Sequence, residues 1–207
     1  MLAYRVYPHL QGAAPGTAGH PRYLGAQGSG RLDNHGHYRI WYLALEPAGA
    51  IAEIFGDLDQ WNAKMFHCPS IPGSRQTLAT FHLDDDTQLL DLDDARNLYT
   101  RGLRPTQVMD RNRSATQTWA LSVYNERNDR GTRIWQGIRW WSYHQPQWRI
   151  IGYWGDNAPR PLATEELTLT SPAVTDAASS LRRHRKPCTP LAGRSQNSPF
   201  RYQVSNA

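Results

Sequence analysis

The distribution of tryptophan constrains the fold of this chain more than any other feature of its sequence. All eight tryptophans lie between Trp41 and Trp154. Side chains of this size bury a large apolar area and therefore gather in a core or at its edge. A chain of 207 residues is also long enough for one sizeable core. We therefore predict a single core that ends near residue 156.

The last quarter of the chain has a different composition. From residue 159 onward it is rich in Ser, Thr, Pro and Ala, and its aromatic residues are Phe200 and Tyr202. Such a segment buries too little apolar surface to offset the entropy that it would lose on ordering. The prediction is a compact domain over 1–158 and a basic, Ser/Pro-rich, disordered tail over 159–207, in which 165–170 can add a short strand.

The net charge of +5 belongs mainly to this tail. Residues 160–207 hold seven Lys/Arg and three Asp/Glu, and the rest of the chain holds 16 and 15. The nearly neutral body argues against a basic nucleic-acid-binding face. Arginines alternate with aromatic residues over 132–154, as in stacking platforms for bases, although the same alternation is typical of a core face. A non-enzymatic nucleic-acid-binding module therefore stays as an alternative function.

The sequence favours a cytoplasmic protein. No apolar stretch approaches the length needed to span a membrane. The N-terminus has no basic start followed by an apolar run, which predicts no signal peptide. Cys68 and Cys188 form neither a disulfide framework nor a CxxC metal pair, as is typical of a reducing compartment.

Strand and helix patterns alternate irregularly, which predicts a mixed α+β domain. Pro47 suits the first turn of a helix over 47–55. At about 100° per residue, Glu53 lies roughly 60° beyond the apolar stripe of that helix, where it can reach a cleft beside the core. Asp93 and Ser114 are predicted to start two further helices. The predicted strands are 3–8, 39–45, 77–83, 89–92, 137–144 and 148–154, and the predicted helices are 47–55, 93–102 and 114–127.

Metal binding is not predicted. His35 and His37 lie two residues apart, but no further histidine or cysteine follows at a spacing known for zinc sites. The acidic runs at 84–86 and 91–94 offer oxygen ligands for magnesium, yet strand ends and helix caps explain them more simply.

Common catalytic motifs are also missing from the sequence. Cys68 has His67 as its neighbour, but no residue in the pattern would orient that pair for nucleophilic catalysis. There is no GxSxG elbow, no P-loop, and no GxGxxG between a strand and a helix.

The segment "GSGRLDNHG", residues 28–36, places Arg31 among three glycines. Glycine lets the backbone turn tightly or approach a ligand closely. A guanidinium in such a loop can grip a carboxylate or a phosphate with several donors. Because glycine clusters are also ordinary turn signals, the loop is either an anion-binding loop or a turn with a solvated arginine.

Four segments occur in an order that resembles the RES domain family, which is named for its arginine, glutamate and serine. They are "YRVYP" with Arg5, the loop "GSGRLDNHG", "YLALEPAGAIAEI" with Tyr42 and Glu53, and "GIRWWS" with Ser142. The resemblance covers residues 3–156.

The loop departs from the family pattern at three positions. Ser29 stands where the family loop has its first glycine, Leu32 replaces the usual aromatic residue, and Asp33 replaces the usual asparagine. Gly30 and Arg31 keep their places.

The resemblance implies a fold similar to ADP-ribosyltransferases, with a split β-sheet and flanking helices. It implies NAD as the substrate, cleavage between nicotinamide and ribose, and no metal. Many RES proteins are toxins of bacterial toxin–antitoxin pairs, so it also implies a cognate antitoxin as a partner, one whose C-terminal segment blocks the cleft.

The resemblance also assigns roles to individual residues. Cleaving the bond develops an oxocarbenium-like cation on the ribose, which a fixed carboxylate stabilises, and Glu53 is the candidate. Arg5 and Arg31, with Gly30 beside them, are the candidates for binding the pyrophosphate.

Two further roles and the acceptor follow from the same resemblance. Tyr42 is expected to stack on nicotinamide or to donate to the ribose, and Ser142 to bond the nicotinamide amide or an attacking phosphate. The ADP-ribose acceptor stays open: phosphate in an NAD phosphorylase, water in a glycohydrolase, or a protein side chain in an ADP-ribosyltransferase.

Overall fold

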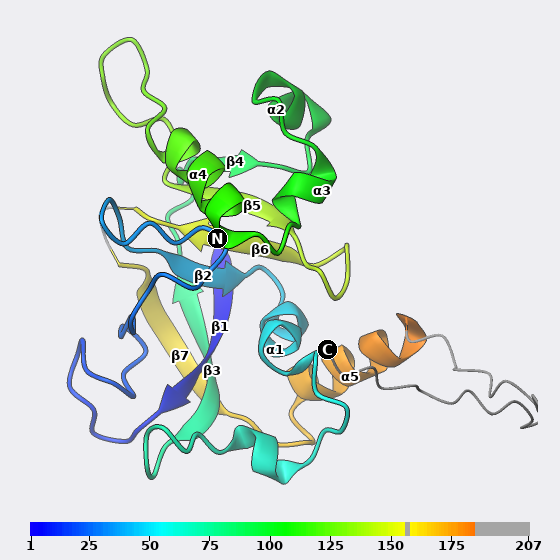
Figure 1. Cartoon of the computed structure of the whole chain (residues 1–207). Coiled ribbons are helices and arrows are strands. Elements are labelled where there is room, and N and C mark those ends of the chain that lie inside the picture. The colour runs from blue at the N-terminus through cyan, green and yellow to red at the C-terminus, as the bar shows by residue number, and fades with distance from the viewer. Residues whose placement is uncertain (156–157, 185–207) are drawn as a thin grey trace, which may run out of the picture.

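The computed structural model of this chain describes residues 1–155 and 158–184 (Figure 1). Its strands are β1 (Leu2–His9), β2 (Trp41–Ala44), β3 (Arg75–His82), β4 (Leu89–Asp91), β5 (Gly137–Trp141), β6 (Arg149–Tyr153) and β7 (Arg160–Glu166). Its helices are α1 (Pro47–Phe55), the 3-10 helix η1 (Ala63–Phe66), α2 (Ala95–Thr100), α3 (Pro105–Val108), α4 (Arg113–Tyr124) and α5 (Pro172–His184).

The seven strands form one sheet in the order β4-β5-β6-β2-β1-β3-β7. β4 and β5 are parallel, and the other neighbours are antiparallel. The register between β1 and β2 holds a single pair, Tyr4 opposite Ala44. The sheet therefore divides there into two halves, whose strands cross at a large angle in Figure 1. The predicted α+β class with a split sheet is confirmed.

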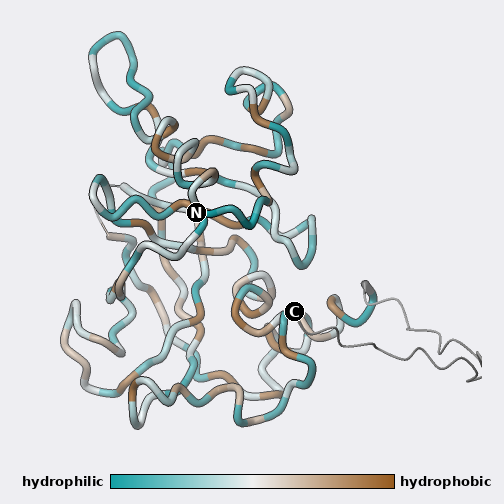
Figure 2. Tube along the Cα trace, viewed as in Figure 1, coloured by the Kyte–Doolittle hydropathy of each residue, from teal (hydrophilic) through white to brown (hydrophobic). Residues whose placement is uncertain are grey.

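The two faces of the sheet carry separate apolar clusters. Along β1, Ala3 and Tyr7 belong to one cluster and Val6 to the other, because successive side chains of a strand point to opposite faces. Figure 2 shows the apolar residues concentrated in the strands and α1, whereas the loop that protrudes between α4 and β5 is hydrophilic.

Helix α1 has the bounds that its proline and apolar periodicity predict. Ile51 and Phe55 are buried in the larger cluster, where α1 lies against the sheet. The same orientation leaves Glu53 and Ile54 exposed. The carboxylate of Glu53 is thereby presented beside the core and not within it.

Most of the aromatic residues of β5, β6 and the segments next to them form a core face. Trp140, Trp148, Tyr153 and Trp154 are all buried. Their rings are therefore not available as a platform for stacked bases. This finding removes the main structural support for the nucleic-acid-binding alternative.

Two elements lie beyond residue 158, where the sequence predicted a disordered tail. β7 pairs with β3 along its length, and α5 packs against α1 with Val174 and Ala177 buried. The prediction of disorder therefore does not hold for 160–166 and 172–184. Composition missed these elements because β7 is joined through backbone hydrogen bonds while its side chains are mostly exposed, and the side chains that α5 buries are small, namely Val174, Ala177 and Ser180. The rest of the predicted tail, 185–207, lies outside the described residues.

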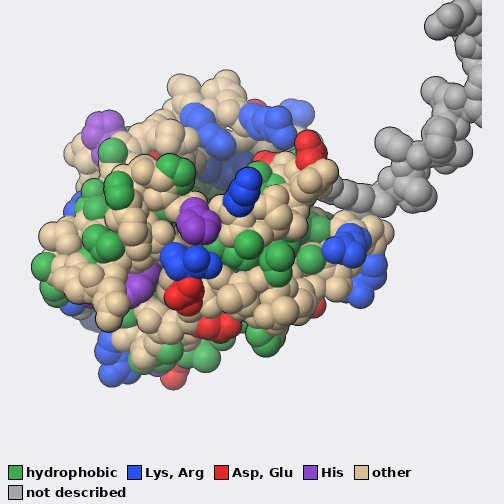
Figure 3. All heavy atoms as spheres, turned by 90° about the horizontal axis from the view of Figure 1, so that it is seen from below, with side chains coloured by type: hydrophobic (Ala, Val, Ile, Leu, Met, Phe, Trp, Pro, Cys, Tyr) green, Lys and Arg blue, Asp and Glu red, His purple; other side chains and the backbone are tan. Residues whose placement is uncertain are grey.

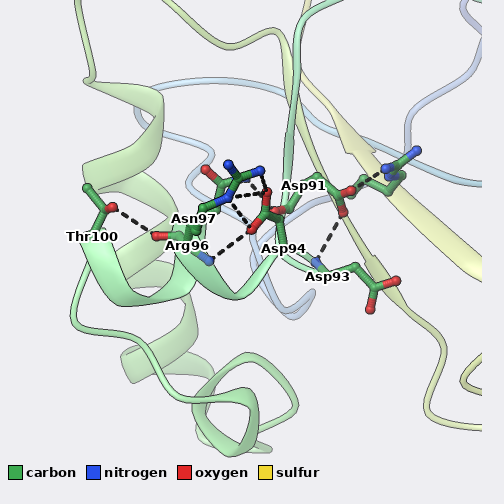
Figure 4. A network of polar contacts seen from close by, with 7 residues as sticks. Asp91, Asp93, Asp94, Arg96, Asn97 and Thr100 are labelled. Carbon is green, nitrogen blue, oxygen red and sulfur yellow. Dashed lines mark hydrogen bonds and ion pairs between the residues drawn. The ribbon is translucent and has the colours of Figure 1, made fainter.

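The aspartates at 91, 93 and 94 form ion pairs, and one of them also caps a helix (Figure 4). Asp91 pairs with Arg139, Asp93 with Arg149, and Asp94 with Arg96. Asp94, not the predicted Asp93, caps α2. Likewise Asn112, not the predicted Ser114, caps α4.

The described residues contain neither a metal-binding cluster nor a membrane-spanning helix. No group of three or more His, Cys, Asp or Glu side chains in 1–155 and 158–184 is arranged to hold a metal ion. Within the same residues, no helix combines the length and the apolar character that crossing a bilayer requires.

Candidate active site

A cleft of about 480 Å³ opens where β1 and β2 diverge. This volume is in the range of small-molecule and cofactor sites. The walls come from β1, the loop before β2, β2 itself, α1, and the connection between α3 and α4. Five of the six predicted site residues line it: Arg5, Gly30, Arg31, Tyr42 and Glu53. Ser142 lies behind the wall.

Arg5, on β1, is one of the residues that line this cleft. One Nη1 hydrogen bond goes to the carbonyl of Tyr23 (3.1 Å), and the guanidinium lies 5.4 Å from the centre of the Trp41 ring. Burial lowers the pKa of Arg5 to about 10, while nearby Tyr7 acts in the opposite direction. The side chain is therefore still charged at neutral pH. No carboxylate in the described part of the chain forms an ion pair with it.

Asp33 organises the glycine loop. It is buried, and its Oδ2 accepts the backbone N–H groups of Gly28 (2.6 Å) and Gly30 (2.8 Å). Its Oδ1 accepts the hydroxyl proton of Tyr42 (2.7 Å). A Cβ on Gly30 would lie 2.5 Å from both Asp33 Oδ1 and Tyr42 Oη, so only glycine fits there. Asp33 thus links the loop to β2.

Two side chains near α4 hold the same loop from the other side. Gln117 Nε2 donates to the carbonyls of Gly28 (3.0 Å) and Gly30 (2.9 Å). Asn34 Nδ2 donates to the carbonyl of Gln117 (2.9 Å). Leu32, which replaces the usual aromatic residue, is 0% exposed and fills the space left by the absent side chain of Gly152. The loop is therefore anchored in the core through Leu32 and Asp33 and also forms a wall of the cleft.

The hydroxyl of Tyr42 is already engaged within this network. It donates to Asp33 and accepts the backbone N–H of Leu32 (2.8 Å). A phenol has a single proton, so that proton is not available for the predicted bond to a ribose hydroxyl. Tyr42 still lines the cleft, and its ring packs edge-to-face with Trp140.

Glu53 and Ser142 form a pair at the opposite wall. The Ser142 hydroxyl donates to Glu53 Oε1 (2.5 Å) and accepts the backbone N–H of His144 (3.1 Å). Ser142 is 1% exposed, so its predicted contact with nicotinamide or an attacking phosphate does not fit this geometry. Its observed position makes it a residue that orients the Glu53 carboxylate.

A model of the RES domain family matches residues 2–176. This is most of the chain, and it includes every residue of the cleft. The chain belongs to the RES domain family. The match extends through β7 and into α5, beyond the domain boundary predicted at residue 158. A comparison with curated proteins found no match.

The rim of the RES cleft contains residues that the sequence analysis missed. Ile54 and Tyr143 are 50% and 62% exposed, although both are apolar and both line the cleft. Arg113, the first residue of α4, lines it as well. The surface seen from below is hollowed, with Lys and Arg side chains in and around the hollow (Figure 3). The sequence predicted that this helix starts at Ser114, and nothing local shows that Arg113 just before it lines the cleft.

Buried tyrosines give a first testable prediction, which concerns stability at alkaline pH. Burial raises the pKa of Tyr7 to about 12, and burial also raises the pKa values of Tyr38 and Tyr42. The unfolded chain loses these protons near pH 10, whereas the folded protein keeps them. Above pH 10 the free energy of unfolding should therefore fall, by up to about 1.4 kcal/mol per pH unit for each tyrosine.

Arg5 acts with the opposite sign, because its lowered pKa means that the folded protein releases a proton that the unfolded chain still holds. Burial also lowers the pKa of Arg31, which therefore acts in the same direction as Arg5, but three tyrosines outweigh two arginines. Denaturant unfolding between pH 9 and 11 measures the sum, and Tyr7→Phe should make the decline shallower. Ionisation of every tyrosine near pH 10, without unfolding, would contradict the prediction.

Proposed function

We propose that this RES protein cleaves the nicotinamide–ribose bond of NAD and transfers the ADP-ribose to phosphate or water. One observation carries the proposal: an arginine with no acidic partner in the described residues and an oriented carboxylate line a single cleft. The positive charge suits a pyrophosphate, and the negative charge suits the ribose cation that would form next to it in the same ligand.

The burial of the Arg5 guanidinium without an acidic partner in the described residues supports an anionic ligand. A charge removed from water is costly unless an opposite charge compensates it. Tyr23 supplies one carbonyl and Trp41 supplies a ring face, but neither neutralises the guanidinium. A pyrophosphate would neutralise it and accept its remaining N–H donors in a paired geometry.

Glu53 supplies the complementary charge for the reaction itself. When the bond between the ribose carbon and the ring nitrogen breaks, its electron pair stays on nitrogen, and nicotinamide leaves as a neutral molecule. Positive charge then develops on the ribose, where a preorganised carboxylate stabilises it. An oxygen of phosphate or water forms the new bond to the same carbon, and water gives up a proton as it does so. No strong general acid is needed for this leaving group.

We also propose that the protein acts as the toxin of a bacterial toxin–antitoxin pair. Family membership and the proposed consumption of NAD support this role, because loss of NAD would stop growth. The partner would be an antitoxin whose C-terminal segment covers the cleft. ADP-ribosylation of a dedicated protein is the alternative use of the same chemistry.

The test is nicotinamide release from NAD by the purified full chain, with and without inorganic phosphate. Release is expected in at least one condition. An increase with phosphate, together with a phosphorylated ADP-ribose product, indicates a phosphorylase, whereas free ADP-ribose indicates hydrolysis. If neither condition gives nicotinamide above a protein-free control, the proposed reaction is wrong.

A further inference from the structure

A second pair of charged residues lies at the α4 end of the cleft. Arg31 reaches from the glycine loop to the connection between α3 and α4, where its Nη1 donates to the carbonyls of Val108 (2.5 Å) and Asp110 (3.1 Å). Neither bond neutralises its charge. Its other two nitrogens make no hydrogen bond to a described residue, and the side chain lines the cleft.

The bonds of Arg31 bring it next to Arg113. The side chain of Arg113 is exposed, lines the same cleft, and makes no hydrogen bond or ion pair with any residue in 1–155 and 158–184. Two positively charged side chains, Arg31 and Arg113, therefore line the same cleft. Burial lowers the pKa of Arg31, and the charge of Arg113 lowers it further.

The acidic groups near this pair do not form ion pairs with it. Glu53 and Asp110 both act on Arg31 in the opposite direction to Arg113. The Glu53 carboxylate, however, is held by Ser142, and Asp110 Oδ1 accepts the backbone N–H of Asn112 (2.9 Å). An anion bound between Arg31 and Arg113 would remove their repulsion and use their free donors.

We propose that Arg31 and Arg113 together bind a phosphate group, with Arg113 as a substrate-binding residue that the RES resemblance did not assign. The identity of the ligand rests on the proposed function: the group is either part of the dinucleotide pyrophosphate or a free phosphate acceptor. The existence of the subsite rests on the two arginines alone. Arg5 stands apart on β1 and would contact the pyrophosphate from that side of the cleft.

Calorimetric titration of the full chain with ADP-ribose, and separately with inorganic phosphate, tests this subsite without requiring turnover. Arg113→Ala should weaken the binding of one of them roughly ten- to hundredfold, as expected for a lost charge-assisted hydrogen bond. Arg113→Lys should restore part of the affinity, because it keeps the charge without the planar fork. Arg130→Ala, an exposed arginine on the loop after α4, removes the same charge away from the cleft and should bind like the wild type.

The two ligands separate the sources of the phosphate group. Weaker ADP-ribose binding places the pyrophosphate at the subsite, and weaker inorganic phosphate binding alone places the acceptor there. The subsite is overturned if Arg113→Ala binds both ligands like the wild type, if Arg130→Ala loses as much affinity, or if the wild type binds neither. Nicotinamide release by the wild type is measured in parallel, so failure of the subsite is distinguished from failure of the proposed reaction.

Discussion

Glu53→Gln is expected to lower the turnover number for nicotinamide release by roughly a hundred- to a thousandfold. The amide has the shape of the carboxylate and can still accept the Ser142 hydroxyl, so the substitution removes mainly the charge. That charge is needed only when the ribose becomes cationic, and binding of ADP-ribose should change little. Steady-state release of nicotinamide from NAD measures the first effect, and calorimetry measures the second.

Two companion variants separate the charge from its position. Ser142→Ala keeps the Glu53 carboxylate but removes the hydrogen bond that orients it, so a smaller loss of about tenfold is expected in turnover. Asp57→Asn removes an exposed carboxylate just after α1 and should leave turnover unchanged. Full activity in Glu53→Gln, with thermal unfolding like that of the wild type, would exclude Glu53 from the reaction.

Local sequence patterns predicted those features that depend on neighbouring residues, such as the bounds of a helix. Pro47 and the apolar periodicity after it fixed the bounds of α1, and so the direction in which Glu53 points. The ordered segments that resemble the RES family also predicted that Arg5, Arg31 and Glu53 would meet in one cleft. All three residues line one cleft, and their part in binding or reaction stays a prediction.

The remaining features depend on contacts between distant segments. Whether Ser142 faces the cleft or Glu53 depends on how the end of β5 packs against α1, and 89 residues separate the pair. Arg113 joins the cleft because Arg31 bonds to the connection before α4. The pairing of β7 with β3 involves backbone groups, which residue type barely constrains. No periodicity in a single sequence encodes such contacts.

The departures in the glycine loop also gained a physical explanation from the structure. Leu32 is a core residue whose volume is matched by Gly152. Asp33 is a hydrogen-bond acceptor for three donors. Neither change removes the loop from the cleft. With aspartate at position 33, the Tyr42 hydroxyl donates its hydrogen bond to a carboxylate within the loop.

Asp33→Ala is therefore expected to destabilise the protein by about 3 kcal/mol. It leaves Gly28 N–H, Gly30 N–H and the Tyr42 hydroxyl without their acceptor, and each unsatisfied buried donor costs about 1–3 kcal/mol, less where water enters the loop. Denaturant unfolding measures the loss. Asp129→Ala, at an exposed aspartate in the loop after α4, should be close to neutral, and an equally small effect in Asp33→Ala would contradict the role of this carboxylate.

Asp33→Asn tests which acceptor receives the hydrogen bond that the Tyr42 hydroxyl donates. The amide oxygen can accept both glycine N–H groups, so the loop should stay folded with a loss near 1 kcal/mol. Its NH₂ group then faces Tyr42 Oη, which already accepts from Leu32, and the hydroxyl proton must turn toward the cleft. ADP-ribose should consequently bind about two- to tenfold more tightly, the worth of one new hydrogen bond. In a double-mutant cycle, Tyr42→Phe should abolish this gain. A gain that survives the loss of the hydroxyl would show that Asp33 acts on the ligand by another route.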